Sequence, residues 1–306
     1  MLKNFTLYVV IQISCLVLLL VTLSSVKINS FRLWTYLNPN VISEGGQAKL
    51  MFNDIKNFTP NDSSIFVIGS SHAYRGYDPR IFRKSGLKLF NMGTSGQNMK
   101  DSYTLLKANK EKVRELILDI YPGVLQDITE ESTLMLIQNS DNDQTAFRIL
   151  KNNITINSLN NISARLFDLN PKPFQYNEKY IYNGYVQKDN DFKSDTNLVY
   201  ESFKPGSNFP YLDSILNYVV QNKMKTCIAS HPLKWNSNYL KFYNNSYLPQ
   251  VNKVLSKYPQ INFYDFTIDH PNNDSLFSDA NHLNQRGVNW YNNQLLNRLN
   301  SNNTIL

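Results

Sequence analysis

The sequence predicts an α/β protein in which a central parallel sheet lies between two layers of helices. Short apolar segments alternate along the chain with longer segments whose apolar residues recur at helical spacing, an order that is typical of parallel sheets. Glycines and small polar residues directly follow two of the apolar segments, where such folds place their functional side chains. An uncharged N-terminal segment precedes this pattern.

The N-terminal segment is predicted to attach the protein to a membrane. No charged residue lies between Lys3 and Lys27, and a membrane-spanning helix needs about 20 apolar residues. We therefore expect a membrane anchor over residues 1–26, a juxtamembrane connector with some helix over residues 27–60, and a folded domain outside the cytoplasm, in the bacterial periplasm or at the cell surface. A cleaved signal peptide, whose apolar core is normally shorter, is the alternative for residues 1–26.

The body of the chain supplies the strands and helices of the sheet. Five apolar segments are predicted strands: residues 65–68, 88–91, 115–120, 226–229 and 261–265. Four segments with helical spacing are predicted helices: residues 102–113, 211–224, 251–257 and 287–299. The alternation stops between about 126 and 207, which we interpret as an insertion and a candidate cap within a domain of residues 61–306.

Composition limits the classes of function. The net charge is +7, but lysines and arginines are scattered, which favours a solvated basic surface, or attraction to anionic envelope polymers or lipid headgroups, over nucleic-acid binding. The two cysteines, Cys15 and Cys227, lie in unrelated segments, so no disulfide framework is expected. No CxxC or HExxH spacing occurs, and we expect neither a metal nor a cofactor.

The first candidate site follows the strand at 65–68. The strand runs into Gly69-Ser70-Ser71-His72. Glycine permits a sharp turn, and the helix that follows would direct its N-terminal N–H groups toward the same point. An exposed serine on such a turn is a candidate nucleophile. A simple helix N-cap is the alternative, because serine is common there.

Two further stretches have residue types that suit the same chemistry. Residues 91–98 (NMGTSGQN) follow the second predicted strand, and their glycines allow a backbone to approach a ligand closely. Asp279 and His282 precede the last predicted helix, where the carboxylate can hold the histidine tautomer while the other ring nitrogen accepts a proton. The alternatives are a capping aspartate beside a surface histidine, or a metal pair that no other cluster completes.

Together, these three stretches resemble the SGNH/GDSL hydrolase superfamily over about residues 62–300. The resemblance implies a flavodoxin-like, three-layer α/β/α sandwich. It also implies that Gly69-Ser70-Ser71 takes the place of the family's Gly-Asp-Ser block. Ser70 would then stand in place of the aspartate, and Ser71 would be the nucleophile. His282 would be its base and Asp279 would orient that base. The N–H groups of Ser71 and Gly96 would form the oxyanion hole.

The third block of that family, Gly-x-Asn-Asp, has no counterpart. The strand at 115–120 ends in LDIYPG, without the asparagine that completes the oxyanion hole in the family, and Asn98 is the substitute that we consider. The Gly-Ser-Ser start and the missing asparagine resemble membrane-anchored branches of the superfamily. Those branches act in the acylation of cell-envelope polymers, such as teichoic-acid D-alanylation and exopolysaccharide O-acetylation.

We therefore expect a serine esterase or O-acyltransferase. It would act on an acylated cell-envelope glycan or polymer, or on a small ester, through an acyl-serine intermediate. A catalytically inactive relative, binding or assembling with partners of an envelope polysaccharide pathway, is the alternative. His72, Arg75 and His231 are candidate pocket residues, and a structural ion pair is the alternative for Arg75.

Overall fold

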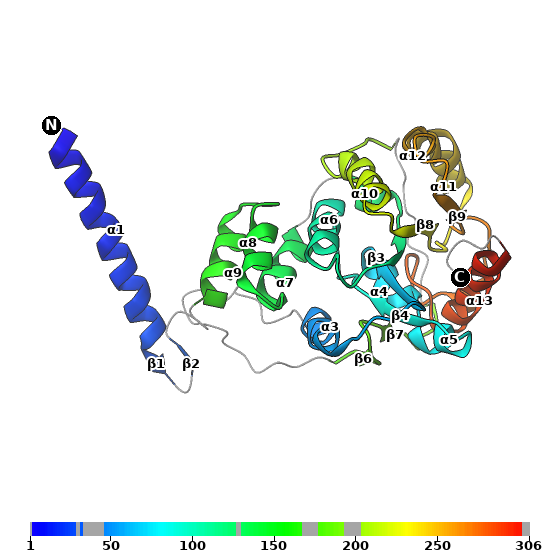
Figure 1. The fold of residues 1–306 in the computed structure, drawn as a ribbon, viewed down its shortest axis with the longest axis horizontal. Helices are drawn as coiled ribbons and strands as arrows, with labels where there is room; N and C mark the ends of the chain where they lie inside the picture. The colour runs from blue at the N-terminus through cyan, green and yellow to red at the C-terminus, as the bar shows by residue number, and fades with distance from the viewer. Residues whose placement is uncertain are drawn as a thin grey trace.

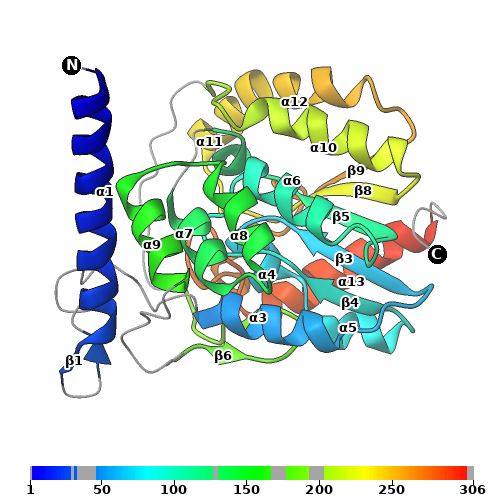
Figure 2. The ribbon, with the colours of Figure 1, turned by 60° about the vertical axis from the view of Figure 1, so that its left-hand side comes forward.

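A five-stranded parallel sheet forms the centre of the protein (Figure 2). The computed structural model describes residues 2–28, 31–32, 46–126, 130–166, 177–192 and 203–301. The strand order is β4-β3-β5-β8-β9, the order of flavodoxin-like sheets. The bounds are β3 (Ser64–Ile68), β4 (Lys88–Asn91), β5 (Glu115–Asp119), β8 (Lys225–Ser230) and β9 (Asn262–Asp265). The predicted α/β fold with a central parallel sheet is confirmed.

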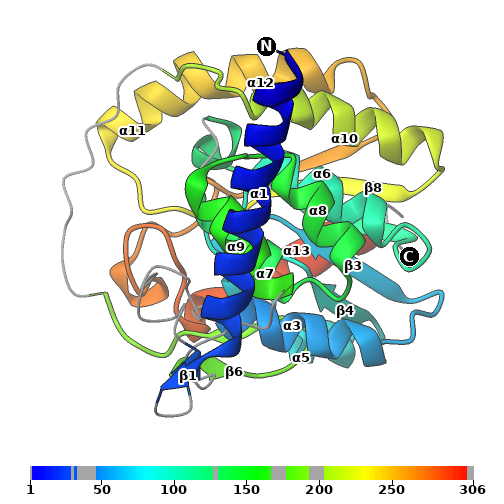
Figure 3. The same ribbon diagram turned by 90° about the vertical axis from the view of Figure 1, so that its left-hand side faces the viewer.

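Helices cover both faces of the sheet. One face packs against α3 (Gly46–Asn57), α6 (Met99–Ala108), α10 (Phe209–Gln221) and α12 (Leu248–Leu255). The other face packs against α4 (Ser71–Gly76), α5 (Pro79–Lys84) and α13 (Gln285–Ser301), and Figure 3 shows α13 behind the sheet with α6 in front. Successive strand side chains point to opposite faces, so Phe66 and Ile68 enter the first core while Ile65 and Val67 enter the second.

The predicted helices are present, but their ends differ from those expected. The helix expected at 102–113 is α6, which begins earlier because the Asn98 side chain accepts a hydrogen bond of 2.8 Å from the Asp101 N–H and caps the first turn. The helix expected at 251–257 is α12. Two further turns, α11 (Ser237–Phe242) and η2 (Tyr243–Tyr247), precede it, and η3 (Asp274–Leu276) follows β9.

A separate helix, α1 (Leu2–Ser25), stands beside the domain and is followed by the paired short strands β1 (Lys27–Ile28) and β2 (Phe31–Arg32) (Figure 1). Among the residues that the structure describes, no helix is both long enough and apolar enough to cross a bilayer. The predicted membrane-spanning anchor is therefore not supported. Part of the predicted connector, residues 29–30 and 33–45, lies outside the described residues, and the rest includes α3.

The stretch expected to be an insertion, residues 126–207, contains three helices and a hairpin in its described part, and the turn η1 (Pro122–Leu125) precedes it. The helices are α7 (Glu130–Asn139), α8 (Asp143–Leu150) and α9 (Ile156–Leu166), and the hairpin strands are β6 (Lys179–Tyr180) and β7 (Val186–Gln187). Residues 127–129, 167–176 and 193–202 lie outside the described part. Asn183 fastens the hairpin to the edge strand β4: its carbonyl accepts from the Asn91 N–H at 2.9 Å and its amide donates to the Leu89 carbonyl at 3.0 Å.

Two glycines with nearly equal backbone angles provide a test of this docking. Gly184, in the hairpin, has φ 82°, and an added Cβ would lie 2.0 Å from the Asn91 carbonyl oxygen. Gly86 has φ 79° and no atom within 4 Å of such a Cβ. Both alanine variants incur the left-handed backbone cost of about 1–2 kcal/mol.

Only Gly184→Ala must also push the hairpin away from β4. We expect its free energy of unfolding, measured by urea denaturation, to fall by about 2 kcal/mol more than that of Gly86→Ala. Equal losses in the two variants would show that the hairpin is not held against β4.

Candidate active site

The structure brings Ser71, His282 and Asp279 into one hydrogen-bonded chain. Ser71 is the first residue of α4, directly after β3, and His282 lies in the loop before α13. The distance from His282 Nε2 to Ser71 Oγ is 2.9 Å. His282 Nδ1 lies 2.9 Å and 3.0 Å from the two carboxylate oxygens of Asp279. Serine, imidazole and carboxylate in this order are the arrangement of a nucleophile, its base and the group that orients the base.

Asp279 fixes the tautomer of His282. Partial burial acts to raise the pKa of the Asp279 carboxyl, but the hydrogen bond and charge of His282, with the N–H groups of Asn281 and His282, hold that pKa at about 2. Asp279 is therefore ionised at neutral pH and accepts a hydrogen bond from the Nδ1–H group of His282. The neutral ring then presents the lone pair of Nε2 to the Ser71 hydroxyl, as a general base must.

Two glycines, which have no side chain, allow α4 to pack closely against the ends of the strands. A Cβ on Gly93 would lie 2.7 Å from the Cβ of Ala73, and one on Gly69 would lie 2.8 Å from the Cβ of Asp119. The buried amide of Asn91 secures the same contact by accepting from the Gly93 N–H at 3.1 Å and donating to the Ala73 carbonyl at 2.5 Å. The stretch that contains Ser71 and the glycine block (residues 91–98) therefore pack as one unit.

Gly96, a predicted oxyanion residue, lies in a tight turn. Gly96 has φ 57°, a left-handed conformation that favours glycine, within the turn closed by the hydrogen bond from the Gln97 N–H to the Thr94 carbonyl. The roles of the Gly96 and Ser71 N–H groups as oxyanion donors stay predictions.

For Asn98 the expectation must be corrected. Its side-chain oxygen caps α6, and its amide donates at 2.8 Å to the Asp101 carboxylate and at 3.2 Å to the Ser132 hydroxyl. An amide nitrogen carries two N–H groups, and both are engaged within the protein. The Asn98 side chain therefore has no N–H left for an oxyanion.

His72 and His231 lie buried beside the hydrogen-bonded chain of Ser71, His282 and Asp279. Both are almost fully buried, and their rings stack with centroids 5.1 Å apart. The His72 ring meets the His282 ring at 5.4 Å. Burial, followed by the charges of His231 and His282, lowers the pKa of His72 well below its usual value, and burial lowers that of His231 to about 3. A neutral His72 ring therefore packs against the His282 ring, and a neutral His231 ring packs against His72.

Arg75, the third candidate pocket residue, makes an ion pair. Its guanidinium donates to both carboxylate oxygens of Glu178, at 2.8 Å and 2.9 Å. Glu178 also pairs with Lys188 at 2.9 Å, just beyond the hairpin. The structural ion pair that was the alternative for Arg75 is present.

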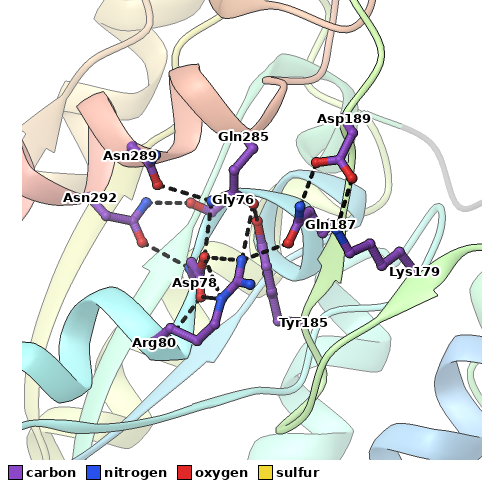
Figure 4. Close-up of polar contacts among 10 residues, drawn as sticks. All are labelled: Gly76, Asp78, Arg80, Lys179, Tyr185, Gln187, Asp189, Gln285, Asn289 and Asn292. Atoms are coloured by element: carbon purple, nitrogen blue, oxygen red, sulfur yellow. Dashed lines mark hydrogen bonds and ion pairs between the residues drawn. The ribbon is translucent and has the colours of Figure 1, made fainter.

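A polar network ties the start of α13 to the end of α4 (Figure 4). Gln285, in the first turn of α13, donates to the Asp78 carboxylate at 3.0 Å, and Asp78 also binds the Arg80 guanidinium. Arg80 donates in turn to the side-chain oxygens of Gln187, in the hairpin, at 2.7 Å and of Gln285 at 3.1 Å. The loop with His282 is thereby held by α5 and by the hairpin.

Sequence reasoning did not assign a role to Asp119, the last residue of β5. It is fully buried, and one of its carboxylate oxygens accepts from the Tyr77 hydroxyl at 2.7 Å. The Tyr291 hydroxyl donates to that of Tyr77 at 2.8 Å. Burial raises the pKa of Asp119 to about 8, although the Tyr77 hydrogen bond acts to lower it. The signal in the sequence is a single acid at the end of an apolar strand.

In the described part of the chain, no group of three histidine, cysteine, aspartate or glutamate side chains is placed to hold a metal ion. No family model matches the sequence. No curated protein matches it either.

Several solved structures share part of the fold. A candidate lipolytic protein of the G-D-S-L family from Desulfitobacterium hafniense DCB-2 is 13% identical over 76% of this chain and 97% of its own, with a TM-score of 0.40. A candidate acylhydrolase from Bacteroides fragilis NCTC 9343 is 12% identical over 83% and 97%, with a TM-score of 0.40. A candidate platelet activating factor from Streptococcus pneumonia is 16% identical over 87% and 96%, with a TM-score of 0.41.

The buried carboxyl of Asp119 predicts a pH dependence of stability. Its pKa is about 8 in the folded protein and close to the ordinary 3.8 in the unfolded chain. Between these values the folded state keeps a proton that the unfolded state releases, so stability falls as pH rises through this window. Asp119→Asn has no proton to lose there and should not share this loss.

The measurement is the thermal unfolding midpoint of both proteins between about pH 5 and pH 8. Comparing the two proteins at each pH cancels the contributions of the buried histidines. We expect the midpoint of the wild type to fall relative to that of Asp119→Asn across this range. A difference that stays constant with pH would mean that Asp119 does not hold a proton in the folded state.

Proposed function

We propose that this protein is a serine hydrolase of ester bonds. The observation that carries the proposal is the chain of hydrogen bonds from Ser71 Oγ through the His282 ring to Asp279. Its distances are those of an activated nucleophile, and the ionised carboxylate of Asp279 leaves Nε2 of His282 free to accept a proton. Residues 91–96 pack beside α4, since a Cβ on Gly93 would lie 2.7 Å from that of Ala73.

The residues support a two-step reaction. Ser71 Oγ attacks the carbonyl carbon of an ester while its proton passes to His282 Nε2, and the N–H groups of Ser71 and Gly96 stabilise the negative oxygen. The tetrahedral intermediate collapses, and His282 returns the proton to the departing alcohol. A second hydroxyl compound, water or an alcohol, then attacks acyl-Ser71, with its proton again passing through His282, and frees the serine.

We further propose that the acyl group belongs to a cell-envelope glycan or polymer. Water as the second reactant makes the protein an esterase, and a sugar hydroxyl makes it an O-acyltransferase. The resemblance of Gly69-Ser70-Ser71 to envelope-acylating branches of the superfamily supports this substrate class. The net charge of +7 supports an anionic polymer.

Labelling with a fluorophosphonate, which reacts with activated serines, tests the mechanism. Ser71→Ala should lose labelling and nitrophenyl acetate turnover completely, because the nucleophile is gone. His282→Ala should lose roughly a thousandfold or more of the turnover, and Asp279→Asn less than either, as in other triads. Ser70→Ala is the matched control. The Ser70 hydroxyl is next to Ser71 in the sequence but has no contact with His282, so labelling should persist.

Equal labelling of the wild type and Ser71→Ala would disprove the mechanism. A folded wild type that reacts with neither reagent would instead favour the inactive binding or assembly protein, for which the missing asparagine of the third block is the supporting observation.

We also propose that α1 attaches the protein to a membrane, with the folded domain on the extracytoplasmic side. Apolar side chains are exposed along the helix, among them Leu16 at 57% and Leu18 at 69%, and no charged residue lies between Lys3 and Lys27. Exposed apolar surface of this extent favours an apolar surrounding.

Fractionation of cells that express the full chain tests this attachment. We expect the wild type to stay with membranes in alkaline carbonate. Leu16→Asp combined with Leu19→Asp should move it to the soluble fraction, since each buried charge costs about 2.5–3.5 kcal/mol in a bilayer. Ile154→Asp, at a site on the domain that is 65% exposed, is the control and should not change the fraction. A soluble wild type would overturn the attachment.

A further inference from the structure

A groove lies on the helical face of the domain, away from the hydrogen-bonded triad. It encloses about 690 Å³ between α6, α8 and α10, which lie side by side in Figures 2 and 3. The residues that line this groove are Lys100, Tyr103, Thr104, Lys107, Lys110, Arg148, Asn152, Tyr211, Tyr218 and Asn222. They combine three kinds of side chain: cations, tyrosines, and small amides or hydroxyls.

The groove carries a concentrated positive charge. Four of its lining side chains are lysine or arginine, and none of the lining residues is an acid. Lys110 pairs with the exposed Glu111 outside the lining at 3.4 Å, an ion pair that water screens and that contributes little. A concave surface with a single sign of charge attracts an anion more strongly than scattered surface charges do.

The floor of the groove is fixed by buried hydrogen bonds. Lys100 Nζ donates to the Asn152 carbonyl at 2.8 Å. The Asn152 amide donates to the Asp101 carboxylate at 2.8 Å and to the Thr104 hydroxyl at 2.9 Å. Asp101 is fully buried and also accepts from Ser132 at 2.6 Å. The polar groups of the groove are therefore positioned before any ligand arrives, which lowers the entropic cost of binding.

The tyrosines present hydroxyl groups rather than open ring faces. The ammonium group of Lys107 lies 4.9 Å from the ring centre of Tyr103, and that of Lys100 lies 5.8 Å from that of Tyr211. The rings of Tyr103 and Tyr218 meet edge to face at 5.8 Å. In the described part of the chain the hydroxyls of these three tyrosines have no hydrogen-bond partner.

We infer that this groove binds an anionic oligosaccharide. Its lysines and arginine pair with the carboxylates or phosphates of the ligand, and its tyrosine hydroxyls and amides bind sugar hydroxyls. A single-stranded nucleic acid would need free aromatic faces on which to stack its bases. A lysine ammonium group already lies over one face of the ring of Tyr103 and of Tyr211. The lining therefore suits an acidic glycan better than a nucleic acid.

The groove follows the length of α6 toward the active site. Lys100 lies in the first turn of α6, Lys107 in the last turn and Lys110 just beyond it. The first turn comes directly after the glycine block, at the edge of the sheet where Ser71 lies. A bound acidic chain would run along α6 toward the edge of the sheet at which Ser71 lies. That the same chain carries the acyl group rests on the proposed function, whereas binding itself does not.

Calorimetry with the full chain tests the groove. The probes are a hexamer of galacturonate, a neutral maltohexaose of equal length and a thymidine oligonucleotide of similar charge. We expect the hexauronate to bind and the maltohexaose to bind at least tenfold more weakly. Lys107→Glu combined with Arg148→Glu should weaken hexauronate binding at least tenfold. Lys253→Glu combined with Lys241→Glu, which makes the same charge change on other helices, should leave it within about twofold, since only long-range charge is altered.

Replacing tyrosine hydroxyls separates glycan from nucleic-acid recognition. Tyr103→Phe combined with Tyr218→Phe should weaken hexauronate binding several-fold while keeping the rings. Equal hexauronate binding by the wild type and the Lys107/Arg148 variant would overturn the proposal. Tighter binding of the thymidine oligonucleotide than of the hexauronate would overturn it in favour of a nucleic acid.

Fluorophosphonate labelling of the same samples separates this proposal from the proposed function. A wild type that does not bind the hexauronate but whose Ser71 is labelled refutes the groove alone. Binding by a protein whose Ser71 does not react refutes the hydrolase alone.

Discussion

One buried side-chain amide, that of Asn292, joins the two halves of the candidate site. It donates to the Gly76 carbonyl at 2.6 Å and accepts from the Asp78 N–H at 2.8 Å, so that α13 is fixed against the end of α4 (Figure 4). A side chain that lacks either the donor or the acceptor cannot make both contacts. Because His282 lies just before α13 and Ser71 begins α4, the 2.9 Å contact between them depends on how these helices dock.

The surroundings of the triad limit where charge can reside. His72 and His231 are buried and neutral, and Asp119 is buried with its pKa raised to about 8. The carboxylate that contacts the His282 ring is that of Asp279. In the proposed reaction, the positive charge on His282 would therefore be balanced by Asp279, which also holds its ring in place. The neutral side chains beside the ring therefore do not compete with Asp279 for the His282 ring.

Local sequence patterns were sufficient to locate the strands and the triad. Each strand is a short apolar segment, and Ser71 and the glycine block directly follow strand ends, which a parallel sheet brings to one edge. Contacts between distant segments could not be read in this way. The burial of His72 and His231 depends on how α4 packs against β8. Asn98 was misassigned because a helix cap and an oxyanion donor require the same residue type.

The distance along the chain between the nucleophile and its base has a consequence during synthesis. Ser71 precedes His282 by 211 residues, and the docking residue Asn292 comes later still. While the chain is still being made, Ser71 lacks the His282 ring that contacts its hydroxyl in the folded protein. Under the proposed mechanism, an incomplete polypeptide therefore cannot form acyl-Ser71. Reactivity would begin only when α13 docks, and acylation of Ser71 would then indicate that the domain has folded.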